Sequence, residues 1–182
     1  MKLYSDIQIW DLIREGRRDA LSMLFNRYYR ALLNYGLKLN ADKPLIKDCI
    51  QEVYIQIWVS RNKIAKVKNV KSYLYTALRR KIIELSNSRN SRAQRQRVYA
   101  TENKVKLLNI EQLKIKKELK KIKKKQLKEA IGQLSNRQRE AIYLKFFDGF
   151  SNDEIAIIMD VNKQSVYNLI SNALKRLEAY LK

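Results

Sequence analysis

The sequence contains no histidine, a single cysteine at Cys49, one proline and four glycines. Without histidine, the chain lacks the side chain that proteins use most often as a general base and as a zinc ligand. A lone cysteine excludes a disulfide framework within the chain, and the apolar helical pattern around Cys49 favours a small buried residue. These absences disfavour catalytic and metal sites built from histidine or cysteine, and we expect no catalytic residue, metal site or cofactor.

Long apolar segments are also missing. No apolar run approaches the roughly 20 residues that a membrane-spanning helix needs. Residues 1–12, MKLYSDIQIWDL, lack the apolar core of a signal peptide and carry acids early. We therefore expect a cytoplasmic protein with no segment inserted in a membrane. The scarcity of glycine and proline, with abundant Leu, Ile, Lys, Arg and Glu, predicts an all-α chain.

Acidic side chains are few compared with basic ones. The 182 residues include 18 Asp and Glu and 39 Lys and Arg, which gives a formal net charge of +21. An excess of this size indicates a polyanionic partner, with nucleic acid ahead of an anionic membrane surface. A lysine-rich proteome is the alternative source of part of the excess. The apolar fraction of 46% permits ordinary cores, and the length suits one large or two small domains.

Apolar residues recur at three- and four-residue intervals in the first half of the chain, which predicts amphipathic helices. The expected helices run from about Ser5 to Glu15, Arg18 to Leu39, Pro44 to Trp58 and Val70 to Asn87. Ser5 is the expected N-cap of the first helix, and Gly16 ends it. A polar, lysine-rich loop at residues 60–72 precedes and overlaps the start of the fourth helix.

The third of these helices has two distinct faces. Its expected apolar stripe consists of Ile46, Cys49, Ile50, Val53, Ile57 and Trp58. Asp48, Gln51 and Glu52 lie at positions i, i+3 and i+4, so they share a different, polar face. Such a face is usually a solvated helix side, yet here it forms a local acidic patch in a very basic protein.

Basic residues concentrate between Arg61 and Arg97, where about a dozen Lys and Arg accompany one acid, Glu84. Tyr73 and Tyr75 are interleaved with them. Basic side chains beside exposed aromatic rings suit single-stranded nucleic acid, because the cations neutralise phosphates while the bases stack on the rings. The alternative for Tyr73 is a place in the hydrophobic core.

A lysine-rich stretch at residues 98–133 predicts a linker that becomes the first helix of a second domain. Two short helical patterns then meet across a tight turn, and a longer amphipathic helix follows. The first expected helix runs from Ser135 to Phe147, and the second begins at a capping box formed by Ser151 and Glu154. A turn at residues 160–162 follows, and the third expected helix runs from Lys163 to Leu181.

This arrangement is that of a helix-turn-helix, whose second helix presents its N-terminal side chains to base edges in the major groove. The candidate contacts on that helix are Lys163, Gln164, Ser165, Tyr167, Asn168, Ser171 and Lys175. Gln and Asn pair with adenine edges, whereas Lys contacts guanine or phosphate. Arg137 and Arg139, in an earlier helix, are candidates for the DNA backbone. The alternative is a plain packing motif of two short helices.

Three segments, in order, resemble the sigma-70 family of RNA polymerase sigma factors, specifically its short two-domain extracytoplasmic-function (ECF) group. DALSMLFNRYYRALLNYGLKL followed by IKDCIQEVYIQIW is similar to the start of the family's region 2, including its D-x-x-Q-E-V-(F/Y)-x-x-(I/L/V)-W signature. KNVKSYLYTALRRKIIEL is similar to the segment that melts and contacts the −10 promoter element. LSNRQREAIYLKFFDGFSNDEIAIIMDVNKQSVYNLISNALKRL is similar to region 4, which contacts the −35 element.

The resemblance implies two small helical domains joined by a basic linker, the C-terminal domain being the helix-turn-helix. The implied boundaries are a region 2-like domain at 1–92, the linker at 93–125 and a region 4-like domain at 126–182. Asp48, Gln51 and Glu52 match the positions that dock on the β′ clamp helices of core polymerase.

The loop at residues 60–69 matches the family's loop that captures a flipped −10 base. Extruding a base costs a few kcal/mol, so a melted strand needs a basic groove and a pocket. The resulting candidates for −10 contacts are Arg61, Asn62, Lys63, Lys71, Tyr75, Arg79 and Arg80.

The function implied is promoter recognition and transcription initiation, without enzymatic activity. The implied partners are bacterial core RNA polymerase, through its β′ and β subunits, promoter DNA and an anti-sigma factor, often membrane-bound. The alternative is a stand-alone helix-turn-helix regulator, which would need neither the acidic face nor the basic, aromatic fourth helix. A nucleic-acid enzyme is disfavoured, because no carboxylate cluster at metal-binding spacing stands out.

Three positions depart from the family pattern. Arg80 and Glu84 lie where the family usually has Asn and Asp, and Asp160 lies at a turn position that is often Gly. Arg80 keeps or increases the attraction to phosphate, and the change bears on how the −10 element is contacted.

Overall fold

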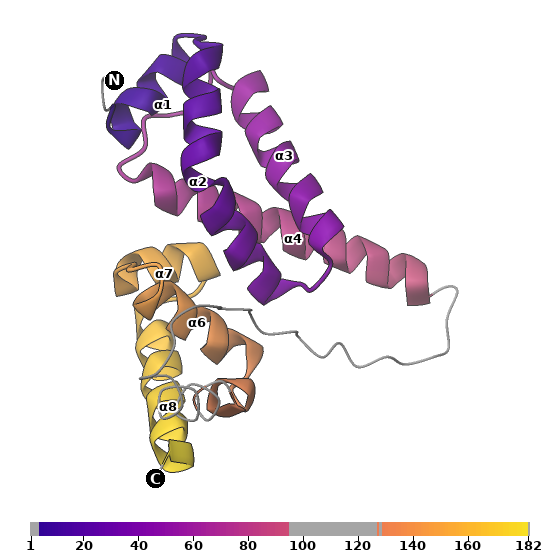
Figure 1. Cartoon of the computed structure of the whole chain (residues 1–182), viewed down its shortest axis with the longest axis vertical. Helices are drawn as coiled ribbons and strands as arrows, with labels where there is room; N and C mark the ends of the chain where they lie inside the picture. Colours follow the sequence, from indigo (N-terminus) through magenta and orange to yellow (C-terminus); the bar gives the residue numbers. More distant parts are fainter. Residues whose placement is uncertain (1–3, 95–126, 128, 182) are drawn as a thin grey trace, which may run out of the picture. The chain divides into compact units, whose positions relative to one another are not determined.

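The structure is a computed structural model that describes residues 4–94, 127 and 129–181 (Figure 1). The chain divides into two compact units, Met1–Asn103 and Lys104–Lys182. Every secondary-structure element in the described ranges is a helix, which confirms the predicted all-α class. Within those ranges, no helix is long and apolar enough to cross a bilayer. The linker predicted at 93–125 lies almost wholly outside the described residues, so its boundaries stay a prediction.

The described part of the first unit consists of α1 (Asp6–Arg14), α2 (Arg18–Leu39), α3 (Lys43–Val59) and α4 (Val70–Gln94). Helix α2 packs against the other three, and α3 also packs on α4 (Figure 1). Their apolar stripes meet in a core whose fully covered side chains include Ile13, Leu24, Leu32, Ile50 and Leu78. The predicted boundaries of the first three helices are confirmed to within one residue, whereas α4 continues beyond its predicted end at Asn87.

Short polar side chains and a glycine delimit these helices. The Ser5 hydroxyl accepts a hydrogen bond from the Gln8 backbone N–H, and the Gln8 side chain accepts one from the Ser5 N–H, which completes a capping box. The Asp42 carboxylate accepts from the Leu45 N–H at 3.0 Å and so begins α3. Gly16 follows α1 with a φ of 88°, a left-handed conformation that favours glycine.

Helices α2, α3 and α4 approach one another at Gly36, which is buried within α2. A Cβ atom at this position would lie 2.4 Å from Cγ2 of Ile46 and 3.4 Å from Cδ1 of Ile82. In the interior of a helix, glycine is less favourable than alanine by about 1 kcal/mol of helix stability. The close approach therefore gives a physical reason for a glycine in the middle of a long helix.

The second unit contains α6 (Asn136–Phe146), α7 (Asn152–Met159) and α8 (Lys163–Leu181). Helix α8 packs against both α6 and α7 (Figure 1), and residues 129–132 are helical as well. A small core joins these segments through Ala130, Leu134, Ile142, Ala173 and Leu177. The predicted pair of short helices followed by a longer one is confirmed, with boundaries that agree to within one residue.

The turn between α7 and α8 contains a strained residue. Asp160 adopts φ 54° and ψ 57° and is the one non-glycine residue with a positive φ in the described ranges. Val161 continues the turn, and its N–H donates to the Ala156 carbonyl at 3.0 Å. Asn162 then caps α8, because its Oδ1 accepts from the Ser165 N–H at 2.7 Å. These bonds fix the change of direction from α7 to α8.

Candidate nucleic-acid and partner interfaces

The N-terminal half of α8 presents a row of polar side chains to solvent. The exposed members of the predicted set are Lys163, Gln164, Tyr167, Asn168, Ser171 and Lys175, and Ser165 is half-buried. The opposite face carries Val166 and Ala173, which are fully buried. The Gln164 amide donates to Oδ1 of Asn168 at 3.2 Å, so the two amides form a pair one helical turn apart.

The first residue of α8 is bound to α7. Nζ of Lys163 lies 2.8 Å from Oδ1 of Asp153, and both side chains are more than half exposed. The hydrogen bond with Asp153 raises the pKa of Lys163 above its usual value. An exposed ion pair is weak in water, so a DNA phosphate would compete with Asp153 for this ammonium group.

The two arginines of α6 differ in their surroundings. Arg137 is exposed in the first turn of the helix, where the sequence predicts a backbone contact. Arg139 is half-buried instead, and its Nη2 donates to the carbonyls of Gly132 and Leu134 at 3.3 and 3.0 Å. Arg139 therefore holds the segment before α6 in place, and Arg137 is the more exposed of the two candidates for a DNA contact.

The predicted acidic face of α3 lies at the surface of the first unit. Asp48 and Gln51 are exposed, whereas Glu52 is half-buried and bridges to α4. Oε2 of Glu52 lies 2.7 Å from Nζ of Lys81, whose side chain is only 15% exposed. The hydrogen bond with Glu52 raises the pKa of Lys81, which favours the charged pair. Glu52 thus joins α3 to α4 in addition to lying on the polar face.

Two exposed apolar side chains extend this face toward the end of α3. Ile55 is 60% exposed and Val59 is 72% exposed. Their spacing from Asp48 places all three on one side of the helix. Exposed branched apolar residues next to a polar rim are typical of protein-docking surfaces. Neither residue is among the contacts predicted from the sequence, although both are apolar residues outside the predicted apolar stripe.

The residues after α3 form a structured turn around Trp58. The Arg61 guanidinium lies 4.5 Å from the centroid of the Trp58 ring, and its Nη1 donates to the Trp58 carbonyl at 2.8 Å. Trp58, expected in the apolar stripe of this helix, is only half-buried, and two arginine guanidinium groups lie over its ring. Asn62 and Lys63 are exposed and follow Arg61 directly.

Two of the −10 contacts predicted on α4 are corrected by the burial of their side chains. Tyr75 is fully buried, with its ring 4.8 Å from that of Tyr35, so it presents no face to a base. Arg79 is only 9% exposed. Both lie close to the apolar stripe of α4, and the spacing of Tyr75 before Leu78, three residues on, was the signal for burial.

The remaining candidates on α4 stay accessible. Arg80 is exposed and Lys71 is half-buried. Tyr73, for which a core position was the alternative, is half-buried and packs edge-on against Trp10 at 4.9 Å between ring centroids. Burial raises the pKa of Tyr73 above its usual value. The aromatic ring nearest the surface in this segment is therefore Tyr73 rather than Tyr75.

Comparisons with known proteins give the same identification in both units. The family model Sigma-70 region 2 matches residues 24–92, and the model Sigma-70, region 4 matches residues 124–177. The fold is similar to that of the sigma factor RpoE in complex with the anti-sigma factor NepR from Bartonella quintana. That match has a TM-score of 0.68 and 22% identity, and covers 88% of this chain and 95% of the other.

A second similar structure is CnrH in complex with the cytosolic domain of CnrY. It has a TM-score of 0.62 and 18% identity, with 97% of this chain and 96% of that chain covered. No curated protein matches the sequence. The two matched regions together span more than half of the chain. The chain therefore belongs to the sigma-70 family of RNA polymerase sigma factors, whose members direct transcription initiation and are not enzymes.

Proposed function

We propose that this protein is the promoter-specificity subunit of a bacterial RNA polymerase, with α8 on the −35 element and the loop at residues 60–69 on melted −10 DNA. The observation that carries the proposal is the row of exposed polar side chains on α8, a helix that begins at the Asn162 cap directly after the turn. A family assignment alone would not say which side chains contact bases. The proposal places the protein in the cytoplasm, where polymerase and promoter DNA meet.

The −35 contacts rest on the chemistry of α8. Gln164 and Asn168 are amides that can pair with the N6 and N7 edge of adenine in the major groove. Lys163 and Lys175 lie before and after them and carry the charge that phosphates require. A recognition helix inserted by its N-terminal half would bring this set to the DNA together.

The contact with core polymerase is proposed for α3. Asp48 and Gln51 supply exposed polar groups, and Ile55 supplies exposed apolar area on the same side of the helix. Removing apolar area from water stabilises a complex, while the carboxylate selects a basic partner surface. Glu52 contributes less direct attraction than the sequence predicts, because Lys81 already neutralises it.

The −10 contacts are proposed for Arg61, Asn62 and Lys63 in the loop, together with Lys71 and Arg80 on α4. The Arg and Lys side chains of this set supply the positive charge that a displaced single strand needs. Tyr75 and Arg79 are omitted because the core covers them.

An anti-sigma factor is proposed as a further partner. The sigma factor RpoE was solved with the anti-sigma factor NepR, and CnrH with the cytosolic domain of CnrY. We infer that a protein of this kind would cover the α3 surface, because exposed Ile55 and Val59 leave apolar area for a competitor of core polymerase.

Binding to core polymerase tests the proposal. The full chain should form a stable complex with bacterial core polymerase, measured by co-elution and by fluorescence titration. Asp48→Asn should weaken that complex, whereas Asp19→Asn, which removes an exposed acid from α2, should leave it unchanged. Sequence-specific duplex binding without any complex with core polymerase would favour the stand-alone regulator.

A further inference from the structure

Helix α1 contacts the loop at residues 60–69 from a part of the chain that precedes the matched region 2, residues 24–92. Nε1 of Trp10 donates to the Ala65 carbonyl at 3.2 Å. Nε of Arg14 donates to the Ile64 carbonyl at 3.1 Å. The loop lacks regular secondary structure here, so α1 satisfies two successive carbonyls that no helix or strand pairs.

These two donors are themselves held in place. Trp10 is only 1% exposed, and its ring packs edge-on against Tyr73 in the first turn of α4. Nη1 of Arg14 also donates to Oδ1 of Asp11 at 3.3 Å, one turn earlier in α1. Each side chain therefore reaches the loop from a fixed position, because packing or an ion pair restricts its rotamers.

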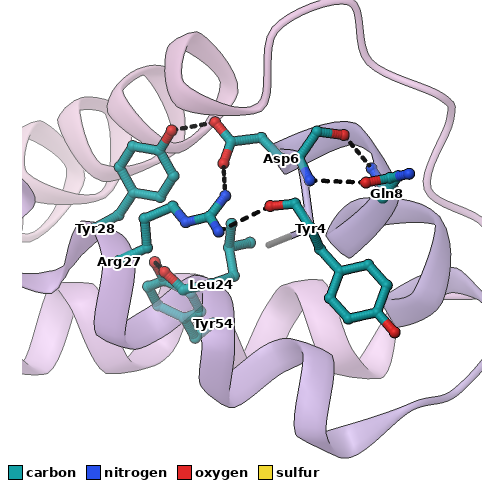
Figure 2. A network of polar contacts seen from close by, with 8 residues as sticks. Tyr4, Asp6, Gln8, Leu24, Arg27, Tyr28 and Tyr54 are labelled. Atoms are coloured by element: carbon teal, nitrogen blue, oxygen red, sulfur yellow. Dashed lines mark hydrogen bonds and ion pairs between the residues drawn. The ribbon is translucent and has the colours of Figure 1, made fainter. Parts of the chain in front are cut away.

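The N-terminal end of α1 is fastened to α2 by a polar network (Figure 2). The Asp6 carboxylate accepts hydrogen bonds from the Tyr28 hydroxyl and from Nη1 of Arg27. Nη2 of Arg27 also donates to the Tyr4 carbonyl at 2.9 Å. Burial and the Asp6 carboxylate raise the pKa of Tyr28, so its hydroxyl stays protonated as a donor. Helix α1 thus joins α2 to the loop through bonds at both of its ends.

We propose that α1 positions the loop that captures the flipped −10 base, with Trp10 and Arg14 as the positioning residues. This inference rests on the proposed function, because it assigns the loop its role on melted −10 DNA. The bonded carbonyls of Ile64 and Ala65 directly follow Asn62 and Lys63, the exposed candidates for base contact.

The physical reason is the precision that a base pocket requires. Discrimination between bases depends on hydrogen bonds whose lengths and angles tolerate little displacement. A loop without the two α1 bonds would sample more conformations, and each correct contact would then cost more ordering entropy. The loss would fall on −10 base discrimination and spare α8, which belongs to the other unit.

The test uses holoenzyme reconstituted from core polymerase and the full chain. Trp10→Phe keeps a ring against Tyr73 but removes the indole N–H, and Arg14→Met removes the Nε donor without supplying another N–H, on a side chain that is one-third exposed. Arg17→Met is the matched control, because Arg17 lies just after α1 and pairs with Asp19 in solvent. Open-complex formation is compared on a selected promoter and on templates with single −10 substitutions.

Each loop-directed variant should lower the ratio of open complexes on matched over substituted −10 bases by roughly 3- to 10-fold, the range expected for one lost hydrogen bond. Binding to core polymerase and discrimination at −35 should match the parent protein and the Arg17→Met control. An unchanged −10 ratio in both variants would overturn the inference. An equal loss on all templates together with weaker core binding would also overturn it, because it would show a role in folding alone.

The parent protein separates this inference from the proposed function. A parent holoenzyme that discriminates −10 bases, with variants that do so equally well, contradicts only the role of α1. A parent chain that forms no holoenzyme contradicts the proposed function, and the inference is then overturned with it.

Discussion

The two units differ in how they present the side chains that we assign to DNA. On α8 the candidate contacts extend from one face of a continuous helix into solvent. In the first unit several predicted contacts are engaged with their own protein, and Arg61 lies against Trp58. Tyr75 and Arg79 are buried. The difference fits two tasks, because duplex DNA accepts a preformed helix in its groove, whereas a single strand must be held by an ordered loop.

A variant pair on α8 gives the largest expected effect and tests the first half of this comparison. Gln164→Ala and Asn168→Ala should each relax −35 base discrimination by about 1–3 kcal/mol, the value of one good base contact. Because the two amides are hydrogen-bonded, their effects should be non-additive in the double variant. Binding of the holoenzyme to a panel of −35 substitutions measures both quantities.

The matched control for this pair is Asn26→Ala, which removes an exposed amide from α2 in the other unit. It should leave discrimination at −35 unchanged. If Gln164→Ala weakened binding equally on every −35 sequence, this side chain would contact phosphate only. The contrast between the two units would then lose its basis.

Two glycine-to-alanine variants, one in each unit, compare the packing of the two units. Gly36→Ala would place a methyl group 2.4 Å from Cγ2 of Ile46, and overpacking of this kind lowers the free energy of unfolding by about 1–3 kcal/mol. Gly132→Ala meets nothing within 4 Å, so it should be neutral or stabilising by up to about 1 kcal/mol.

Denaturant titration measures both glycine variants. The chain's two tryptophans, Trp10 and Trp58, lie in the first unit, so their fluorescence follows the unit that contains Gly36. Circular dichroism follows the Gly132→Ala variant. Equal losses of stability in the two variants would contradict the close contact among α2, α3 and α4.

A smaller effect is expected from releasing Lys163 on α8. Asp153→Asn removes the carboxylate that holds Nζ of Lys163 at 2.8 Å, so the ammonium group becomes available to a phosphate. Binding to duplex promoter DNA should strengthen, and the slope of log affinity against log salt should steepen by about one. An unchanged slope would show that Lys163 contacts no phosphate.

The smallest effect is expected at the turn before α8. Asp160→Gly should stabilise the second unit by about 0.5 kcal/mol, because glycine adopts a φ of 54° without the strain of a Cβ atom. Thermal unfolding followed by circular dichroism measures the change. A loss of stability would mean that the Asp160 side chain contributes more than its backbone conformation costs.

The structure shows the surroundings of the three residues that depart from the family pattern. Asp160, where the family often has Gly, occupies a left-handed conformation in which glycine is favoured. Glu84, where the family usually has Asp, places Oε2 3.6 Å from Nζ of Lys81. Arg80, where the family usually has Asn, is exposed on α4 and adds positive charge there.

Local patterns predicted the parts of the molecule that depend on near neighbours. The N-cap at Ser5, the capping box at Ser151 and the exposed row on α8 follow from three- and four-residue spacing, and the structure agrees with that spacing. A helix-turn-helix is therefore largely predictable from one sequence, because the residues that define it lie close together in the chain.

Contacts between distant segments were not predictable in this way. The burial of Tyr75 depends on Tyr35 in α2, 40 positions earlier in the sequence. The bridge from Glu52 to Lys81 and the bond from Trp10 to Ala65 likewise join separate elements. Periodicity identifies a face of a helix, but the neighbour that covers this face depends on the tertiary packing.

Transcription by reconstituted holoenzyme tests the central claim most directly. Core polymerase and the full chain would be given promoters selected from a random DNA pool, and transcript start sites would be mapped. The account predicts initiation at one defined start that requires the chain, with loss of initiation when either the −35 or the −10 element is altered. A chain that binds selected duplex DNA yet leaves core polymerase without promoter-specific initiation would contradict it.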